Sequence, residues 1–298
     1  MTLKYVIKRN VKLFFKDKGV FFTSLITPVI LLVLYATFLA NVYKDSFASA
    51  LTESVKLSEK LINGLVGGQL ISSILAVSCV TVPFCSNMIA VQDKANGTVK
   101  DLSITPVKGS VLALGYYLST FISSLIICFA GMGICLVYIG ATGWYMTISQ
   151  ILLLALDVFL LVMFGTALSS IVGYFLSSQG QISAVGTIVS SGYGFICGAY
   201  MPISQFSPFL QKVISFLPGT YGTSLVRNHA MQGALSEIEK QGVPSEAMNE
   251  LMNVVDCNLY FFDEKVSISS MYAILGITIA CLVFIYTVMN YKKTAKRG

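Results

Sequence analysis

The chain has 298 residues, of which 55% are hydrophobic and only 11% are charged, and its mean hydropathy is +0.76. Because a soluble domain carries about 25% charged residues, this composition argues against a soluble enzyme, a disordered protein and a coiled coil. It predicts a polytopic membrane protein. The net charge of +6 would suit a nucleic-acid-binding protein, but the basic residues cluster between apolar segments, so membrane topology explains them better and no nucleic-acid partner is expected.

The N-terminal residues 1–19 predict an amphipathic helix that lies in the membrane interface. One face carries Leu3, Val6, Ile7, Val11, Phe14 and Phe15, and the other carries Lys4, Lys8, Lys12 and Lys16. This spacing favours a helix whose basic face meets anionic headgroups of the lipid bilayer. The alternative, a basic flank that only sets the topology, explains the charge but not the periodicity.

Six apolar segments are long enough to cross a bilayer core of about 30 Å, which takes about 20 residues. They are residues 20–42, 65–91, 111–140, 148–176, 182–202 and 268–290. Lysine and arginine concentrate in the N-terminal segment, in the loop 92–110 and in the C-terminal tail, whereas acidic residues dominate the other connections. The positive-inside rule therefore predicts a multi-pass plasma-membrane protein with both termini in the cytoplasm.

Residues 203–267 form the largest predicted external piece. The stretch between Pro202 and Pro218 is short and contains Lys212, which indicates a re-entrant or interfacial segment rather than a span. The more acidic remainder predicts a small helical cap. The expected fold is thus an all-α membrane protein, a single domain over residues 1–298 with six transmembrane helices, an N-terminal interfacial helix and a short re-entrant or external helix before the last span.

The chain lacks the motifs of common catalytic and nucleotide sites. It contains no Gly-x-x-x-x-Gly-Lys-Ser/Thr, no His-Glu-x-x-His and no Gly-x-Ser-x-Gly. The single histidine, His229, argues against a metal site, and the seven cysteines show no disulfide framework. We therefore expect no catalytic residues, no metal ligands and no enzymatic activity in this chain.

Two features inside the spans leave alternatives open. Asp157 is an ionisable residue near the middle of its span, so it is either a proton, cation or substrate contact, or a partner in an interhelical hydrogen bond to Ser, Thr or Tyr. In the fifth span a strip of small residues recurs every four positions. It permits close approach of another helix, either within the chain or in a second subunit, and it consists of Gly186, Ser190, Gly194 and Gly198.

The predicted cytoplasmic loop 92–110 contains signals for a short helix. Asn96-Gly97 indicates a turn, Thr98 with Asp101 three residues later suits a capping box, and Pro106 would end the helix. A plain hairpin loop is the alternative, and the spacing alone does not choose between them.

This loop resembles that of the ABC-2-type permease family, the membrane subunits of many ABC exporters. The resemblance rests on Asp93, Gly97-Thr98, Leu102 and Thr105-Pro106-Val107, on the order of the predicted helices, and on Phe216-Leu217-Pro218-Gly219-Thr220-Tyr221, which looks like the family's external signature. The family often has Glu-Arg before Gly-Thr, whereas this sequence has Gln92, Asp93 and Lys94.

The resemblance implies a half-transporter that pairs with a second permease copy or a homologue and with two separate ATP-binding subunits, which would bind ATP and Mg while this chain holds no cofactor. It implies export of a drug, peptide or lipid-like substrate. The residues expected to couple to the ATPase are Asp93, Gly97, Thr98, Asp101 and Leu102, and the candidates for the substrate path are Ser72, Ser73, Asp157, Tyr193 and Phe195. The alternatives are an ion-coupled secondary transporter that uses Asp157 and a non-transporting membrane sensor or immunity protein.

Overall fold

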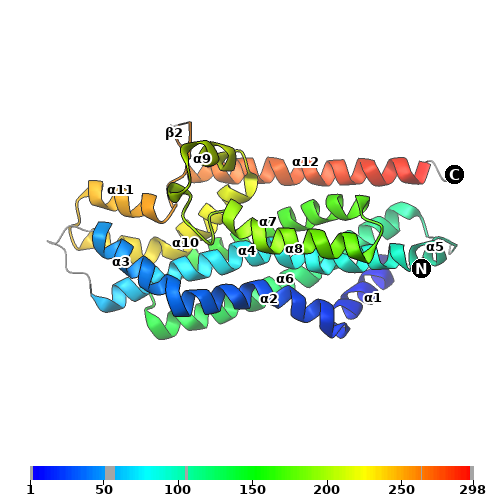
Figure 1. Ribbon diagram of the computed structural model, residues 1–298, viewed down its shortest axis with the longest axis horizontal. Coiled ribbons are helices and arrows are strands. Elements are labelled where there is room, and N and C mark those ends of the chain that lie inside the picture. Colours follow the sequence, from blue (N-terminus) through cyan, green and yellow to red (C-terminus); the bar gives the residue numbers. More distant parts are fainter. Residues whose placement is uncertain (1–2, 51–57, 105–106, 263, 296–298) are drawn as a thin grey trace.

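The computed structural model describes residues 3–50, 58–104, 107–262 and 264–295, and most of these residues are helical. The long helices run side by side along the long axis of the molecule, and both termini lie at the same end (Figure 1). We call this the terminal end and the opposite end the cap end. The prediction of an all-α fold is confirmed, apart from one two-stranded hairpin.

The chain begins with α1 (Leu3–Lys16) and α2 (Lys18–Leu34), which meet at an angle of 72°. Asp17 separates them and caps α2, because its carboxylate Oδ1 accepts a hydrogen bond of 3.2 Å from the backbone nitrogen of Val20. A π-helical segment, η1 (Tyr35–Leu39), then joins α2 to α3 (Ala40–Ala50). The first predicted span is therefore one continuous helical stretch that extends past its predicted end.

Helix α4 (Glu59–Ala95) is the centre of the bundle. It has 37 residues, and nearly all side chains of its apolar middle part are buried. Glycines let neighbouring helices approach it closely: a Cβ atom on Gly68 would lie 2.8 Å from the Met231 side chain. Helices α2, α6, α7, α8 and α10 all pack against α4.

The next helices follow the predicted segments. They are α5 (Thr98–Ile104), α6 (Gly109–Thr142), α7 (Ile148–Phe175) and α8 (Gln179–Ile196). Capping boxes fix the starts of α7 and α8, formed by Thr147 with Gln150 and by Ser178 with Gln181. Of the two alternatives left open for the loop 92–110, the structure has the short helix, α5, and not a plain hairpin loop.

The predicted external piece forms η2 (Ile203–Gln205), α9 (Pro208–Ser215), α10 (Pro218–Lys240), α11 (Ser245–Val254) and a hairpin of β1 (Tyr260–Phe261) and β2 (Glu264–Lys265). Two backbone register pairs align the antiparallel strands. The last helix, α12 (Ile268–Ala295), returns to the terminal end. Helix α10 lies within the bundle, against α4, α7 and α12, instead of only capping it.

In the part of the chain that the structure describes, four helices are long and apolar enough to cross a membrane, namely α4, α6, α7 and α12, and the bent pair of α1 and α2 would make a fifth. Helix α8, which corresponds to the predicted span 182–202, is not among them, because glutamine, serine and glycine residues interrupt its apolar sequence. A multi-pass membrane protein is thus supported, while the count of six spans stays a prediction.

Candidate functional site

An ion pair at the terminal end joins three helices. Arg9 of α1 binds Asp93 of α4 through both carboxylate oxygens, with Nη1–Oδ2 at 2.6 Å and Nη2–Oδ1 at 3.2 Å. The Tyr116 hydroxyl of α6 donates a further hydrogen bond of 2.6 Å to Asp93 Oδ2. Two-point binding of a carboxylate by arginine fixes distance and orientation together, so this Arg9 ion pair holds α1 in register with α4 and α6.

Further contacts seat α1 on α6. The Asn10 side-chain amide donates to Ser119 Oγ at 3.3 Å, and a Cβ atom on Gly115 would lie 2.5 Å from Val6 Cγ1. Val6, Asn10 and Phe14 are buried, whereas Tyr5, Leu13 and Phe15 remain exposed. One apolar side of α1 therefore packs against the protein. The predicted contact of α1 with the membrane interface would be made by its exposed apolar residues.

Lys94, the residue after Asp93, contacts a different helix. Its Nζ donates to the backbone carbonyls of Gly173 at 2.7 Å and Tyr174 at 3.2 Å, in the last turn of α7. The last turn of a helix exposes carbonyls that the helix itself does not pair, and the negative end of the helix dipole attracts a cation there. Two consecutive residues of α4 thus connect it to α1 and α6 on one side and to α7 on the other.

Helix α5 follows directly after these contacts. Gly97 adopts a φ of 80°, which glycine tolerates best, and its carbonyl accepts bonds from the backbone nitrogens of Lys100 and Asp101. Thr98 is the first residue of the helix, so it does not occupy the predicted capping position ahead of it. Thr105 and Pro106 lie outside the described residues.

The predicted coupling residues are therefore close in space but differ in exposure. Asp93 is buried in the Arg9 ion pair, Gly97, Thr98 and Leu102 are half-buried, and Asp101 is exposed. Leu102 packs against the hydrophobic core. Ile104 of the same helix is 85% exposed.

A family model described as ABC-2 type transporter matches residues 1–230, which is more than half of the chain. The chain belongs to the ABC-2 type transporter family. A search of curated proteins finds no match to it. The matched region of this ABC-2 type permease includes the Arg9 ion pair and α5, and it ends inside α10.

A second polar cluster of the permease lies between α7, α10 and α12. Asp157 is fully buried, its Oδ2 lies 2.6 Å from His229 Nδ1, and its Oδ1 accepts a hydrogen bond of 2.6 Å from the Tyr272 hydroxyl. The sequence had left open a bond to a tyrosine as the explanation of Asp157, and the structure supplies one. The partner His229 was not anticipated, since its 72-residue separation from Asp157 follows no local pattern.

The strip of small residues on α8 packs mainly within the chain. The Tyr200 hydroxyl donates to the carbonyl oxygen of Ser190, and a Cβ atom on Gly194 would clash with the Tyr200 ring. Gly198 lies beyond the end of α8 with a φ of 75°. Gly186 has the Met88 side chain 3.7 Å from its Cβ position. A role of the strip in binding a second subunit stays a prediction.

The candidate residues for the substrate path do not share one surface. Ser72 and Ser73 belong to α4 and are buried in the bundle. The Tyr193 hydroxyl is buried against Gly219 at the start of α10. Phe195 is 50% exposed and packs edge-on against Tyr200 at 5.1 Å. Among the residues that the structure describes, no cluster of His, Cys, Asp and Glu could hold a metal ion.

A second arginine–aspartate pair lies toward the cap end. Arg227 of α10 contacts Asp256 Oδ2 at 3.2 Å and donates to the Gly198 carbonyl at 2.8 Å. The backbone nitrogen of Ile203 also donates to Asp256 Oδ2, at 2.9 Å. Burial raises the pKa of Asp256 to about 6, although Arg227 opposes this shift. This Arg227 ion pair fastens α10, the turn after α8 and the segment after α11 to one another.

Proposed function

We propose that this permease is the membrane subunit of an ATP-driven exporter that pairs with a second permease copy or a homologue and with two separate ATP-binding subunits. The observation that supports it best is the terminal end: α5 presents Asp101 and Ile104 outward, directly after two residues that contact α1, α6 and α7. Helix α5 packs against α4, and α4 contacts α1, α6 and α7 through Asp93 and Lys94, so a movement of α5 can reach the bundle through α4.

The central helix is the element that would carry this push. At 1.5 Å per residue, the 37 residues of α4 extend for about 55 Å. Because α4 packs closely against α10 near Gly68, a tilt imposed at α5 also changes the packing at the cap end. Packed interfaces switch between discrete arrangements, so the expected motion is a rigid-body shift of helices biased by the nucleotide state of the partner.

The proposed transport direction and cargo rest on analogy with the family alone. The proposed substrate is a drug, peptide or lipid-like molecule that moves outward between two permease subunits. ATP and Mg would be bound by the ATP-binding subunits, which supply the free energy of hydrolysis. The positive-inside rule supports a cytoplasmic position for the terminal end, with α5 and both termini, where the ATP-binding subunits would be.

The first experiment is purification of the tagged chain in mild detergent, followed by an ATPase assay on the proteins that co-purify. We expect an ATP-binding subunit with vanadate-sensitive activity. The Ile104→Asp variant should lose this partner or its ATPase response, because it puts a charge in the proposed contact. Ile148→Asp is the matched control, since Ile148 is 78% exposed at the opposite end of the bundle and should leave both unchanged.

The main alternative is an ion-coupled secondary transporter, and the Asp157–His229 pair favours it over the others, because ionisable residues buried within spanning helices often mark an ion pathway. Reconstitution of the permease alone in liposomes separates the two functions. Transport driven by a proton or sodium gradient without any ATP-binding subunit would replace the exporter proposal. Transport that requires both the partner and ATP would support the proposal.

A further inference from the structure

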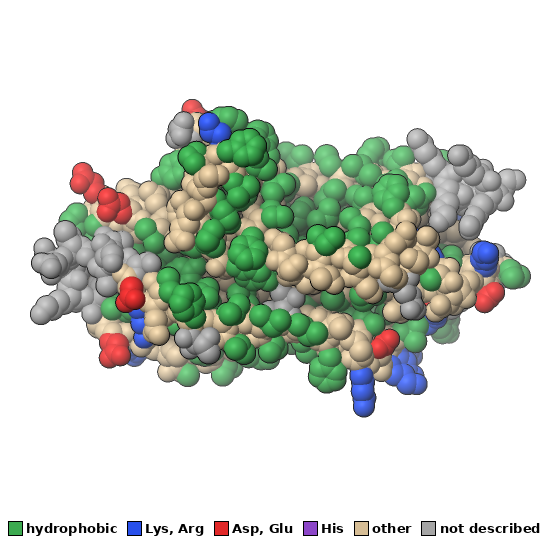
Figure 2. Space-filling view, viewed as in Figure 1, with side chains coloured by type: hydrophobic (Ala, Val, Ile, Leu, Met, Phe, Trp, Pro, Cys, Tyr) green, Lys and Arg blue, Asp and Glu red, His purple; other side chains and the backbone are tan. Residues whose placement is uncertain are grey.

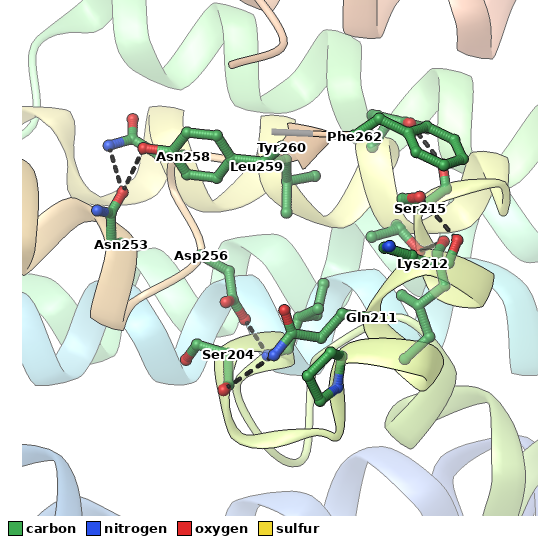
Figure 3. Close-up of a pocket in the computed structure, with 15 residues that line it drawn as sticks. Ser204, Gln211, Lys212, Ser215, Asn253, Asp256, Asn258, Leu259, Tyr260 and Phe262 are labelled. Carbon is green, nitrogen blue, oxygen red and sulfur yellow. Dashed lines mark hydrogen bonds between the residues drawn. The ribbon is translucent and has the colours of Figure 1, made fainter. Parts of the chain in front are cut away.

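A pocket of about 290 Å³ opens near the cap end between α9 and the segment 253–262. In Figure 3 the residues of α9 line one side of this space, and Asn253, Asn258 and Tyr260 line the other. Ligand pockets start at about 300 Å³, so the volume suits a small molecule or the polar head of a larger one. None of the functions considered above uses this pocket.

The walls of the pocket are polar and held by hydrogen bonds. Asn253 Oδ1 accepts bonds from the Asn258 amide at 2.8 Å and from the Tyr260 hydroxyl at 3.1 Å. On the opposite wall, the Gln211 amide nitrogen donates to the carbonyls of Ser204 and Phe206. Amide groups fixed in this way are preorganised to bind a polar ligand with little further ordering.

The charge of the pocket is unbalanced. Lys212 is the one cation and Asp256 the one carboxylate that line it, in the part of the chain that the structure describes. Asp256 is already neutralised by Arg227. No carboxylate of the described residues lies within ion-pair distance of Lys212, whose Nζ lies 5.9 Å from the centre of the Phe262 ring. The remaining positive charge favours an anionic ligand.

The rim of the pocket is apolar and exposed. The Phe216 ring packs edge-on against the rings of Phe261 at 5.2 Å and Phe262 at 5.9 Å, yet all three side chains are exposed. Phe209 and Val213 add to the exposed apolar surface of α9. Hydrophobic side chains gather over α9, close to the start of α12 (Figure 2). Exposed phenylalanines and aliphatic residues on one face of a short helix suit a position in the membrane interface.

From these features together we propose that the pocket binds the phosphodiester headgroup of an anionic phospholipid of the outer leaflet. The Lys212 ammonium group would donate to the phosphate, the amides and hydroxyls would bind the glycerol part, and the acyl chains would lie along the exposed apolar residues of α9. The proposal requires no transport and no ATP-binding subunit, so it stands or falls independently of the exporter function.

The test uses the full chain in nanodiscs that contain equal amounts of phosphatidylglycerol and phosphatidylcholine. After transfer to mild detergent, mass spectrometry measures the ratio of the two lipids retained. We expect phosphatidylglycerol to be enriched over phosphatidylcholine on the wild type. In Lys212→Gln this enrichment should fall about tenfold, because one hydrogen bond to a charged group is lost. Lys212→Arg should keep the binding. Lys60→Gln is the matched control, because Lys60 is exposed at the start of α4 and lies outside the pocket.

Equal retention of the two lipids by the wild type would overturn the proposal, as would equal enrichment on Lys212→Gln and Lys60→Gln. A competition with soluble glycerol 3-phosphate distinguishes the source of the phosphate. Displacement of the lipid only at concentrations far above that of the lipid supports the membrane source, because the acyl chains contribute to binding. Displacement at equal concentrations would assign the site to a soluble phosphate and contradict the lipid.

Discussion

The permease contains two arginine–aspartate pairs of the same chemistry in two different surroundings. In the Arg9 ion pair the arginine side chain is 28% exposed and the aspartate 11%. In the Arg227 ion pair these values are 1% and 4%. Arg9 binds its carboxylate at two points, whereas Arg227 makes one contact to Asp256 and uses its second nitrogen on a backbone carbonyl.

The difference in exposure indicates how much free energy the opening of each pair would cost. A pair whose arginine reaches water loses less when it opens, because water replaces part of the contact, and fully exposed pairs mark the lower limit at about 0–1 kcal/mol. A buried pair that loses one partner leaves a charge without solvation, which costs about 3–5 kcal/mol. The Arg9 ion pair therefore suits a joint that opens during a cycle, and the Arg227 ion pair suits a fixed attachment of α10 to the cap.

The largest expected effect is that of Arg227→Met. This change leaves Asp256 buried without its cation, and we expect the free energy of unfolding to fall by about 3–5 kcal/mol. Thermal or denaturant unfolding of the detergent-solubilised protein measures it. The double variant Arg227→Met/Asp256→Leu removes both charges and should recover part of the loss. Equal destabilisation by Arg227→Met and Arg9→Met would contradict the contrast between the two pairs.

The pH dependence of stability sharpens the same contrast. The pKa of Asp256 is about 6 in the folded protein because of burial, and an unfolded aspartate titrates near 4. Between these values the folded state holds more protons than the unfolded state, so stability should fall as the pH rises from about 4 to about 6, by at most about 3 kcal/mol. Above pH 6 this contribution is constant.

The control for this pH dependence is Asp256→Asn, which has no group to titrate at that position. The difference in melting temperature between the wild type and Asp256→Asn should change between pH 4 and pH 6 and stay level above it. A difference that is flat over the whole range would show that Asp256 keeps an ordinary pKa in the folded protein.

The sequence predicts the long helices well and the polar contacts poorly, for a physical reason. Length and hydropathy suffice for α4, α6, α7 and α12, since each is apolar over enough residues to cross a bilayer. Length and hydropathy do not reveal that helix α10 is buried in the bundle, because its buried residues include Arg227 and His229. Burial of such residues depends on partners 29 and 72 residues away, which no periodicity reveals.

The candidate site shows the same division. The turn at Gly97 and the short helix α5 follow from local signals, so the loop could be predicted. Arg9, by contrast, is the one arginine in α1 and lies outside the four-residue spacing of the lysines, but neither feature identifies its partner. Arg9 meets Asp93 only because α1 packs on α6, and this tertiary contact is not encoded in the local sequence.

The smallest expected change in stability is also the most informative about function. Tyr116→Phe removes one hydrogen bond to Asp93 and keeps the ion pair, so the free energy of unfolding should fall by about 1 kcal/mol. Arg9→Lys keeps the charge but not the two-point geometry, and it should cost a similar amount. If the Arg9 ion pair is a joint of the coupling path, both variants should lower the substrate-stimulated ATPase activity of the complex far more than they lower stability. Activity that follows stability in both variants would make the Arg9 ion pair a structural contact like its buried counterpart.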